Sequence, residues 1–400
     1  MLRKNYRNVL IIVGVAALVV IYLQLWQFMA ANPIELTKKD FISQYTAGRI
    51  ANSGDWGNVY NLNTQIAQQE KITGIPIVSN NFPPFMHPPF ILPLLALIAY
   101  FAYVPAYHLW AVIQIILSVL SAWVLLDAIP RLRRQKVISI SILLFFPVFI
   151  SILSGQDSTV LLLGLSLWAY GLLFDRDGIA GLGLAIVTIR PQIALILAIP
   201  FLFKRRKVLW WFLGGAAVLG VLSIALIGIK GAVGFFQILG ISAKGEGYFL
   251  NETAMINFLG LLKRWFPAMS SPAANISGWV MYIAAAVLLC IIWVRASKIE
   301  EKQIGLAVLL AIFAAPHLQY HDLAALLIPV ICLMSIINKA QLWNDLVTAL
   351  LPLGISWILF LSNFADFFKY NVPYLLGLII GLMLWYPGIF SRRQRAKEFA

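Results

Sequence analysis

Long apolar blocks separated by short polar segments occupy most of the chain. A helix needs about 20 apolar residues to cross the roughly 30 Å hydrocarbon core of a bilayer. Most of the blocks approach that length, so the pattern predicts an all-α polytopic membrane protein. The expected spans are 9–29, 107–129, 137–153, 159–174, 208–229, 279–294, 304–315, 323–337, 346–361 and 372–390.

One further block, 179–203, is interrupted at its middle by Arg190 and Pro191. Proline inside a helix removes a backbone hydrogen bond and favours a break. We expect two short helices that meet at this point, and a single tilted, kinked span is the alternative. Counted as two helices, the block brings the prediction to about twelve transmembrane passes in a single domain over 1–400.

Two polar segments are too long to be simple connections between spans. Residues 32–89 are too polar to lie in lipid, and the short apolar stretch 90–103 that follows them is broken by Pro93. We expect 32–106 to form a large external loop that includes interfacial helices. Residues 230–276 are expected to form a second external segment.

The composition agrees with a membrane protein, because 61% of the residues are hydrophobic and only 12% are charged, with a mean hydropathy of +0.86. The net charge of +14 raises the possibility of nucleic-acid binding. The basic residues, however, gather in short segments beside apolar blocks, which is typical of cytoplasmic loops and not of a basic stripe for nucleic acid. We therefore expect a cytoplasmic (plasma) membrane protein with both termini in the cytoplasm and no nucleic-acid partner. These basic segments contain Arg3, Lys4 and Arg7; Arg131, Arg133, Arg134 and Lys136; Lys204, Arg205, Arg206 and Lys207; and Arg392, Arg393, Arg395 and Lys397.

The first block follows a basic segment, as the apolar part of a signal peptide does. Block 9–29 is nevertheless too long for that class and lacks a convincing small-residue cleavage site, so we interpret it as an uncleaved first span. The two cysteines, Cys290 and Cys332, both lie inside apolar blocks. They have no metal-binding spacing and indicate nothing about the redox compartment.

Arg190 is the most informative charged residue, because it lies in the apolar run 182–203 without an acidic neighbour in sequence. An arginine at the centre of a membrane helix costs at least about 3 kcal/mol, so such residues usually face a cavity and a partner. Its planar fork suits a phosphate or a carboxylate. The alternative is a structural ion pair with Asp157 or Asp322.

Asp40 lies just beyond the first span and follows two lysines. A carboxylate near cations stays ionised and can act as a general base. An ordinary solvated loop aspartate or a helix N-cap is the alternative interpretation. Arg49 ends the same segment and is a further candidate for substrate binding.

The segment 316–322 places His317, His321 and Asp322 at the mouth of two apolar spans. Imidazoles can carry protons near neutral pH, so hydrogen bonding or substrate contact is expected. Spacing of four residues between the histidines also makes a metal site conceivable, and passive packing is the third alternative. Pro316 favours a chain break here and a third ligand is not evident, so we predict no metal and no cofactor.

Gln156 and Asp157 occupy a tight turn between two spans, and His87 lies in a proline-rich stretch before the apolar segment 90–103. A polar turn with a helix N-cap is the alternative for the first pair, and a structural role is the alternative for His87. In the predicted topology, Asp40, Gln156–Asp157 and 317–322 all fall on the outer side. Arg190 joins them if its two helices break near that face.

Several of these features, taken in order, resemble glycosyltransferase family 87 of the GT-C superfamily. They are an early Asp in a large external loop, a Pro-Pro element, a Gly-Gln turn, a glycine-rich helix ending in basic-Pro (181–191), and a late Pro-His and His-Asp element. The resemblance covers about residues 40–322 and implies a GT-C-like bundle. It also implies sugar transfer from a polyprenyl-phosphate donor, with Asp40 as the base. The residues implied to line the donor pocket are Gln156, Asp157, Arg190, His317, His321 and Asp322.

We therefore expect a membrane glycosyltransferase that moves a hexose, with mannose as the expected sugar, to an envelope lipid or glycan acceptor on the outer face of the cytoplasmic membrane. Membrane lipids are its other expected partners. The alternative from a different class is a secondary transporter or lipid flippase, because broken helices and a midplane arginine occur there too. No internal inverted repeat supports that alternative.

Overall fold

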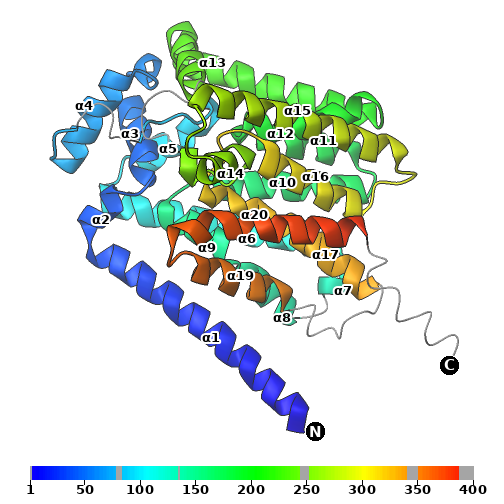
Figure 1. The fold of residues 1–400 in the computed structure, drawn as a ribbon. Coiled ribbons are helices and arrows are strands. Elements are labelled where there is room, and N and C mark those ends of the chain that lie inside the picture. Colours follow the sequence, from blue (N-terminus) through cyan, green and yellow to red (C-terminus); the bar gives the residue numbers. More distant parts are fainter. Residues whose placement is uncertain (1, 78–82, 134–135, 244–251, 340–349, 387–400) are drawn as a thin grey trace, which may run out of the picture.

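Every regular element in the described part of the computed structural model is a helix, which confirms the all-α fold class (Figure 1). The basic C-terminal segment around Arg392 and Lys397 lies outside this part. The described residues are 2–77, 83–133, 136–243, 252–339 and 350–386.

Within these ranges, six helices are long and apolar enough to cross a membrane. They are α1 (Leu2–Ala31), α6 (Tyr103–Ala128), α13 (Arg206–Ala243), α15 (Ser271–Arg295), η6 with α17 (Tyr320–Leu326 and Leu327–Lys339) and α20 (Asp366–Trp385). Six long apolar helices support a polytopic membrane protein, whereas the count of twelve passes stays a prediction.

Six further segments are apolar but shorter, and the first of them falls in the stretch 90–103 that was expected to be interfacial and not a pass. They are η2 with α5 (Pro89–Ile91 and Leu92–Ile98), α8 with α9 (Lys136–Leu143 and Phe146–Ser154), α10 (Ser158–Leu173), α11 with η3 (Asp177–Ile186 and Val187–Ile189), α12 with η4 (Pro191–Ala198 and Ile199–Leu202) and α19 (Leu351–Ser362). A helix of 10–17 residues is shorter than the hydrocarbon core is thick. Such helices belong inside a bundle, where neighbours cover their ends.

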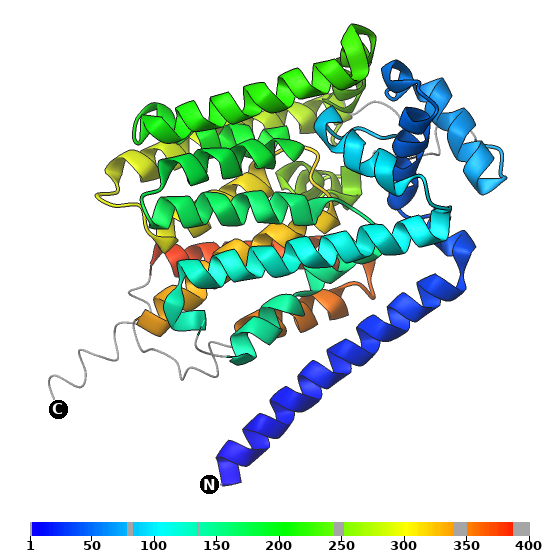
Figure 2. The ribbon, with the colours of Figure 1, turned by 180° about the vertical axis from the view of Figure 1, so that it is seen from behind.

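The helices lie side by side, and the bundle has two distinct ends (Figures 1 and 2). At one end, here named the α3 end, lie α2 (Pro33–Thr37), α3 (Phe41–Asn52), α4 (Leu62–Thr73) and α5. The beginning of α1 and the end of α20 both lie toward the opposite end, here named the α7 end after α7 (Pro130–Arg133). The N-terminal half of α1 diverges from the bundle (Figure 2).

The interrupted block 179–203 is a helical hairpin and not one kinked span. Arg205 Nε donates to Asp177 Oδ1 at 2.8 Å, and Arg205 Nη1 donates to the Leu172 carbonyl at 2.9 Å, which joins the two outer ends of the hairpin. Arg190, with φ −125° and ψ 82°, forms the break between η3 and α12. Each arm measures about 20 Å at 1.5 Å per residue, and the tip carries Arg190.

Glycines let α10 and α11 approach closely. A Cβ on Gly183 would lie 2.6 Å from the Trp168 backbone nitrogen, and one on Gly171 would lie 2.3 Å from the backbone nitrogen of Ala180. Small residues are enriched at membrane helix interfaces because they allow this backbone approach. The close packing fixes α11, and hence the hairpin tip, against α10.

The polar region at the α3 end is itself folded. A Cβ on Gly48 of α3 would lie 2.4 Å from the Leu95 carbonyl oxygen of α5, and Asn52 donates to the Ala96 carbonyl at 2.8 Å. The expectation that 32–106 is an external loop with interfacial helices stays a prediction. The helix predicted to end at residue 229 instead continues as α13 to Ala243 past a break at Gly228.

We predict that Gly183→Val destabilises the protein by about 1–3 kcal/mol, because the added methyl groups must separate α10 from α11. Thermal unfolding in detergent measures the change. Gly220→Val in α13 is the matched control, since no atom lies within 4 Å of a Cβ at that position. Equal stability of the two variants would contradict the close packing of α10 and α11.

Candidate active site

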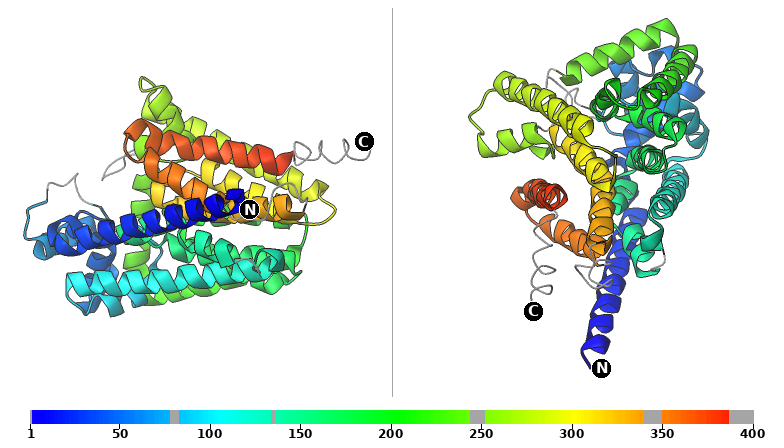
Figure 3. Two further views of the ribbon diagram at one scale, coloured as in Figure 1. Left: turned by 90° about the horizontal axis from the view of Figure 1, so that it is seen from below. Right: turned by 90° about the vertical axis from the view of Figure 1, so that its right-hand side faces the viewer.

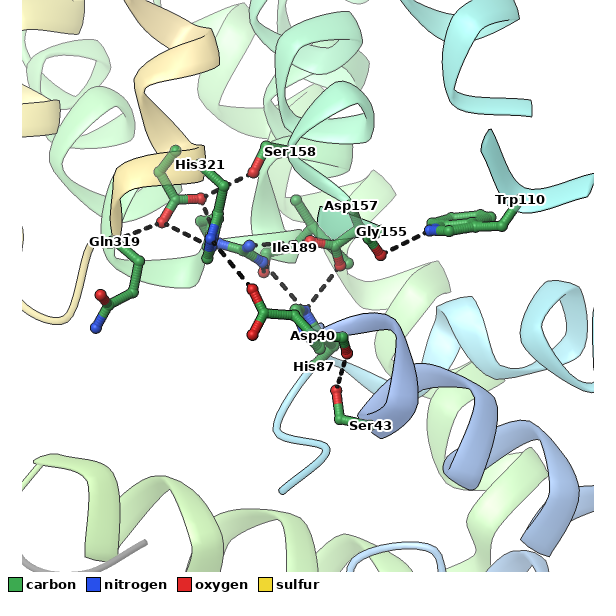
Figure 4. Close-up of polar contacts among 12 residues, drawn as sticks. Asp40, Ser43, His87, Trp110, Gly155, Asp157, Ser158, Ile189, Gln319 and His321 are labelled. Carbon is green, nitrogen blue, oxygen red and sulfur yellow. Dashed lines mark hydrogen bonds and ion pairs between the residues drawn. The ribbon is translucent and has the colours of Figure 1, made fainter. Parts of the chain in front are cut away.

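Five chain breaks meet at the α3 end and bring polar side chains together (Figure 4). Each break lies next to a helix end, so the backbone on at least one side is held in regular structure. The residues are Asp40 before α3, His87 before η2, Asp157 between α9 and α10, Arg190 at the hairpin tip, and His321 with Asp322 in η6.

Arg190 is the centre of this cluster. Its Nη2 lies 2.9 Å from Asp157 Oδ1, and its Nε lies 3.0 Å from Asp322 Oδ1. Its Nη1 lies 3.1 Å from His87 Nδ1 and donates to the Ile189 carbonyl at 3.2 Å. The ion pair considered from the sequence is therefore present, with both of the carboxylates named there.

Asp157 is placed by the turn between α9 and α10. Gly155 adopts φ 72°, a conformation that favours glycine, and a Cβ there would lie 2.5 Å from Phe41 Cβ at the start of α3. Trp110 Nε1 donates to the Gly155 carbonyl at 2.8 Å. The turn thus packs α3 and α6 against the start of α10, and Asp157 Oδ2 lies 2.7 Å from His87 Nδ1.

Asp322 is held by two other groups besides Arg190. Its Oδ2 accepts from the Gln319 backbone N–H at 3.0 Å within a capping box, and its Oδ1 accepts from Ser158 Oγ at 3.2 Å. The sequence interpretation missed Ser158, although its position directly after Asp157 was a usable signal. These bonds satisfy a carboxylate that is almost entirely buried.

His321 connects the buried part of the cluster to Asp40. Its Nδ1 lies 3.8 Å from Asp40 Oδ2, and its Nε2 lies 3.6 Å from Asp322 Oδ2. The Asp40 side chain is 40% exposed, whereas the side chains of Asp157 and Asp322 are each 1% exposed. Asp40 is therefore the carboxylate of the cluster that an incoming molecule can reach.

Charge in the cluster is unbalanced. Three carboxylates (Asp40, Asp157 and Asp322) face one guanidinium, so the cluster carries a net charge of −2 when both imidazoles are neutral. Burial alone would raise the pKa of Asp157, but the charge of Arg190 and the hydrogen bond with His87 outweigh burial and hold this pKa below its ordinary value. Asp157 is thus an ionised partner of Arg190 at neutral pH.

The remaining predicted site residues have other surroundings. Arg49 is exposed and donates to the Ala99 carbonyl at 3.3 Å. His317 lies near Glu252, where burial lowers its pKa and Glu252 opposes that shift. Gln156 is buried, and its side-chain oxygen has no hydrogen-bond partner among the described residues. Roles for these three residues stay predictions.

Neither a metal nor a cofactor was expected at this site. In the described part of the chain, no group of three or more His, Cys, Asp or Glu side chains is placed to hold a metal ion. Arg190 occupies the centre of the carboxylates, the position that a cation would otherwise take.

The comparison with known protein families decides the class. The model of glycosyltransferase family 87 matches residues 85–318, which is more than half of the chain. The chain belongs to glycosyltransferase family 87. No curated protein and no solved structure gave a significant match. The sequence resemblance is thereby confirmed, and the protein is a membrane glycosyltransferase.

The residue range that matches the family model contains only part of the cluster. His87, Asp157 and Arg190 lie inside the matched range, whereas Asp40, His321 and Asp322 lie outside it. The fold brings these outer three residues to the inner three. The cluster is therefore our candidate active site for this family 87 glycosyltransferase.

We predict that Asp157→Asn destabilises the protein by about 3–5 kcal/mol, because it leaves part of the Arg190 charge buried and uncompensated. Asp40→Asn, at the exposed edge of the cluster, should change stability far less. Thermal unfolding in detergent compares the two variants. A similar, small effect of both would show that the pair between Arg190 and Asp157 does not hold the site together.

Proposed function

We propose that this glycosyltransferase moves a hexose, with mannose as the expected sugar, from a polyprenyl-phosphate donor to a lipid or glycan acceptor. The transfer would take place on the outer face of the cytoplasmic membrane. The single observation that carries the proposal is the position of Asp40. It is a reachable carboxylate, adjacent through His321 to a buried network of ion pairs.

Asp40 acts as the general base in this proposal. The acceptor hydroxyl gives its proton to the Asp40 carboxylate while its oxygen bonds to the anomeric carbon of the donor sugar. The bond between that carbon and the phosphate oxygen breaks, and the phosphate leaves with the electron pair. A single displacement of this kind inverts the configuration at the anomeric carbon.

The net negative charge of the cluster suits such a displacement. Positive charge develops at the anomeric carbon in the transition state, and fixed carboxylates in a dry site stabilise it. Arg190 acts here as a positioning residue, because it holds Asp157 and Asp322. The contact between Arg190 and the donor phosphate that the sequence suggested would require one of these pairs to open.

The distribution of cations supports an outward-facing site. The loops at the α7 end and the residues next to them include four cations, Lys204, Arg205, Arg295 and Lys298. The beginning of α1 and the end of α20 lie toward the same end. Loops rich in lysine and arginine stay on the cytoplasmic side. In this proposal the α3 end, with the candidate active site, faces outward.

A transporter or flippase remains the second candidate because of the broken helices at the site. The α11–α12 hairpin has the discontinuous geometry found near transporter binding sites. Family 87 membership favours sugar transfer over this alternative.

We predict that Asp40→Asn lowers the rate of sugar transfer by at least about 100-fold, the order expected when a general base is lost, while the protein level in the membrane stays unchanged. Transfer from radiolabelled polyprenyl-phosphate mannose to extracted envelope lipids is the measurement. Asp55→Asn is the matched control, since Asp55 lies in the same polar region and, among the described residues, its carboxylate accepts side-chain hydrogen bonds from its neighbour Asn58. Full activity of Asp40→Asn would remove the proposed base.

Cysteine labelling tests the orientation. In a variant with serine at Cys290 and Cys332, Lys71→Cys in α4 should react with an impermeant maleimide on intact cells. Lys298→Cys should react only after the membrane is opened. Both positions are exposed, so access to the reagent depends on the side of the membrane. The opposite labelling pattern would place the candidate site in the cytoplasm.

A further inference from the structure

The charge balance of the candidate active site leaves the donor phosphate without a cation. Arg190, the only guanidinium in the cluster, is engaged by two carboxylates. A phosphodiester beside three carboxylates would be repelled, because like charges raise each other's energy strongly where water is excluded. If the donor is a lipid phosphate, as the proposed function holds, its phosphate needs cations next to the cluster and not within it.

Two cations are candidates for this role, one in α14 (Phe258–Trp265) and one at the start of α20. The Arg264 guanidinium carbon lies 5.7 Å from the centre of the Tyr370 ring, and Lys369 Nζ lies 5.2 Å from the same centre. Lys369 Nζ also lies 5.7 Å from the centre of the Tyr320 ring. Two like charges thus converge on one aromatic side chain.

Neither charge is neutralised by a carboxylate among the described residues. Arg264 donates only to uncharged oxygens, namely the carbonyls of Thr253, Met255 and Tyr370 and the side-chain oxygen of Asn371. Burial lowers the pKa of Arg264 to about 10, because its charge is partly removed from water without a counter-ion. A bound anion would supply the missing charge.

One of the two cations lies beside the element that carries His321. Tyr320 and His321 are neighbours in η6, with Asp40 next to His321 and Lys369 over the Tyr320 ring. The leaving phosphate must lie across the sugar from the attacking hydroxyl, and hence from the base, so its cations are expected outside the group of carboxylates.

The surroundings of the two cations suit a lipid. Several aromatic side chains beside them are more than half exposed, which is typical of a membrane–water interface. Both α15 and α20 pack against α16 (Glu301–Ala314), and they lie on the same side of the bundle (Figure 3). The exposed aromatic residues are Trp265, Phe266, Phe364, Phe367 and Phe368.

We propose that Lys369 and Arg264 bind the phosphate of the polyprenyl donor, with the neighbouring aromatic side chains against its isoprenoid chain. This phosphate subsite lies at α14 and at α20. Residue 369 is beyond the range 85–318 that the family model covers.

Charge reversal at Lys369 provides the test. Lys369→Glu should raise the KM for polyprenyl-phosphate mannose at least 10-fold and leave the KM for the acceptor unchanged. It should weaken binding of polyprenyl phosphate itself, measured by native mass spectrometry on purified protein, by a similar factor. Lys230→Glu is the matched control, an exposed cation of α13 near Gly57 at the α3 end.

The binding measurement separates this inference from the proposed function. Loss of polyprenyl phosphate binding in Lys369→Glu, with no sugar transfer by the unaltered protein, would keep the subsite and overturn the transferase donor assignment. Unchanged polyprenyl phosphate binding in Lys369→Glu would overturn the subsite. The subsite would also be overturned if Lys369→Glu lost a bound phospholipid but still bound polyprenyl phosphate, because the two cations would then bind lipids of the surrounding bilayer.

A second variant protects the test against a folding defect. Arg264→Lys keeps the charge but loses the hydrogen bonds to Thr253, Met255 and Asn371, so some loss of stability is expected. If the protein folds, Arg264→Lys should retain more polyprenyl phosphate binding than Arg264→Gln. Equal binding by these two variants would remove the contribution of the Arg264 charge.

Discussion

The pairing of one buried guanidinium with two buried carboxylates is the constraint on which the rest of the site depends. Arg190 contacts Asp157 and Asp322, which lie 33 residues before it and 132 residues after it. Breaking such a pair leaves an uncompensated charge in a medium that solvates it poorly. The short hairpin, the turn at Gly155 and the capping box of η6 all have to keep their places for the three charges to meet.

This constraint also explains why we propose Asp40, and not Asp157 or Asp322, as the base. The buried charges are occupied with one another, so they act on a substrate through position and electric field. Only Asp40 combines contact with the network, through His321, with access from outside. The net negative charge of the cluster favours positive charge at a sugar carbon and disfavours a phosphate in the same place. Under the proposed mechanism, the sugar and the phosphate of the donor would therefore occupy separate regions.

Much of this arrangement was open to prediction from the sequence, and the reasons for the exceptions are physical. Apolar block length predicts the helices, and an arginine next to a proline in such a block predicts both a break and a partner. Asp157 and Asp322 were named as possible partners, but sequence gives no distances. Ser158 was missed because hydroxyl groups in turns are common. Lys369 was missed because its position beside Tyr320 arises only when α20 packs against the bundle.

The short arms of the α11–α12 hairpin have a consequence for the shape of the acceptor. Helical arms of about 20 Å that start at the inner membrane surface end about 10 Å below the outer surface of a 30 Å hydrocarbon core. Arg190 and its partners would then sit at the bottom of a depression. In the proposed outward-facing orientation, an acceptor would have to extend its hydroxyl-bearing end below the membrane surface to reach Asp40.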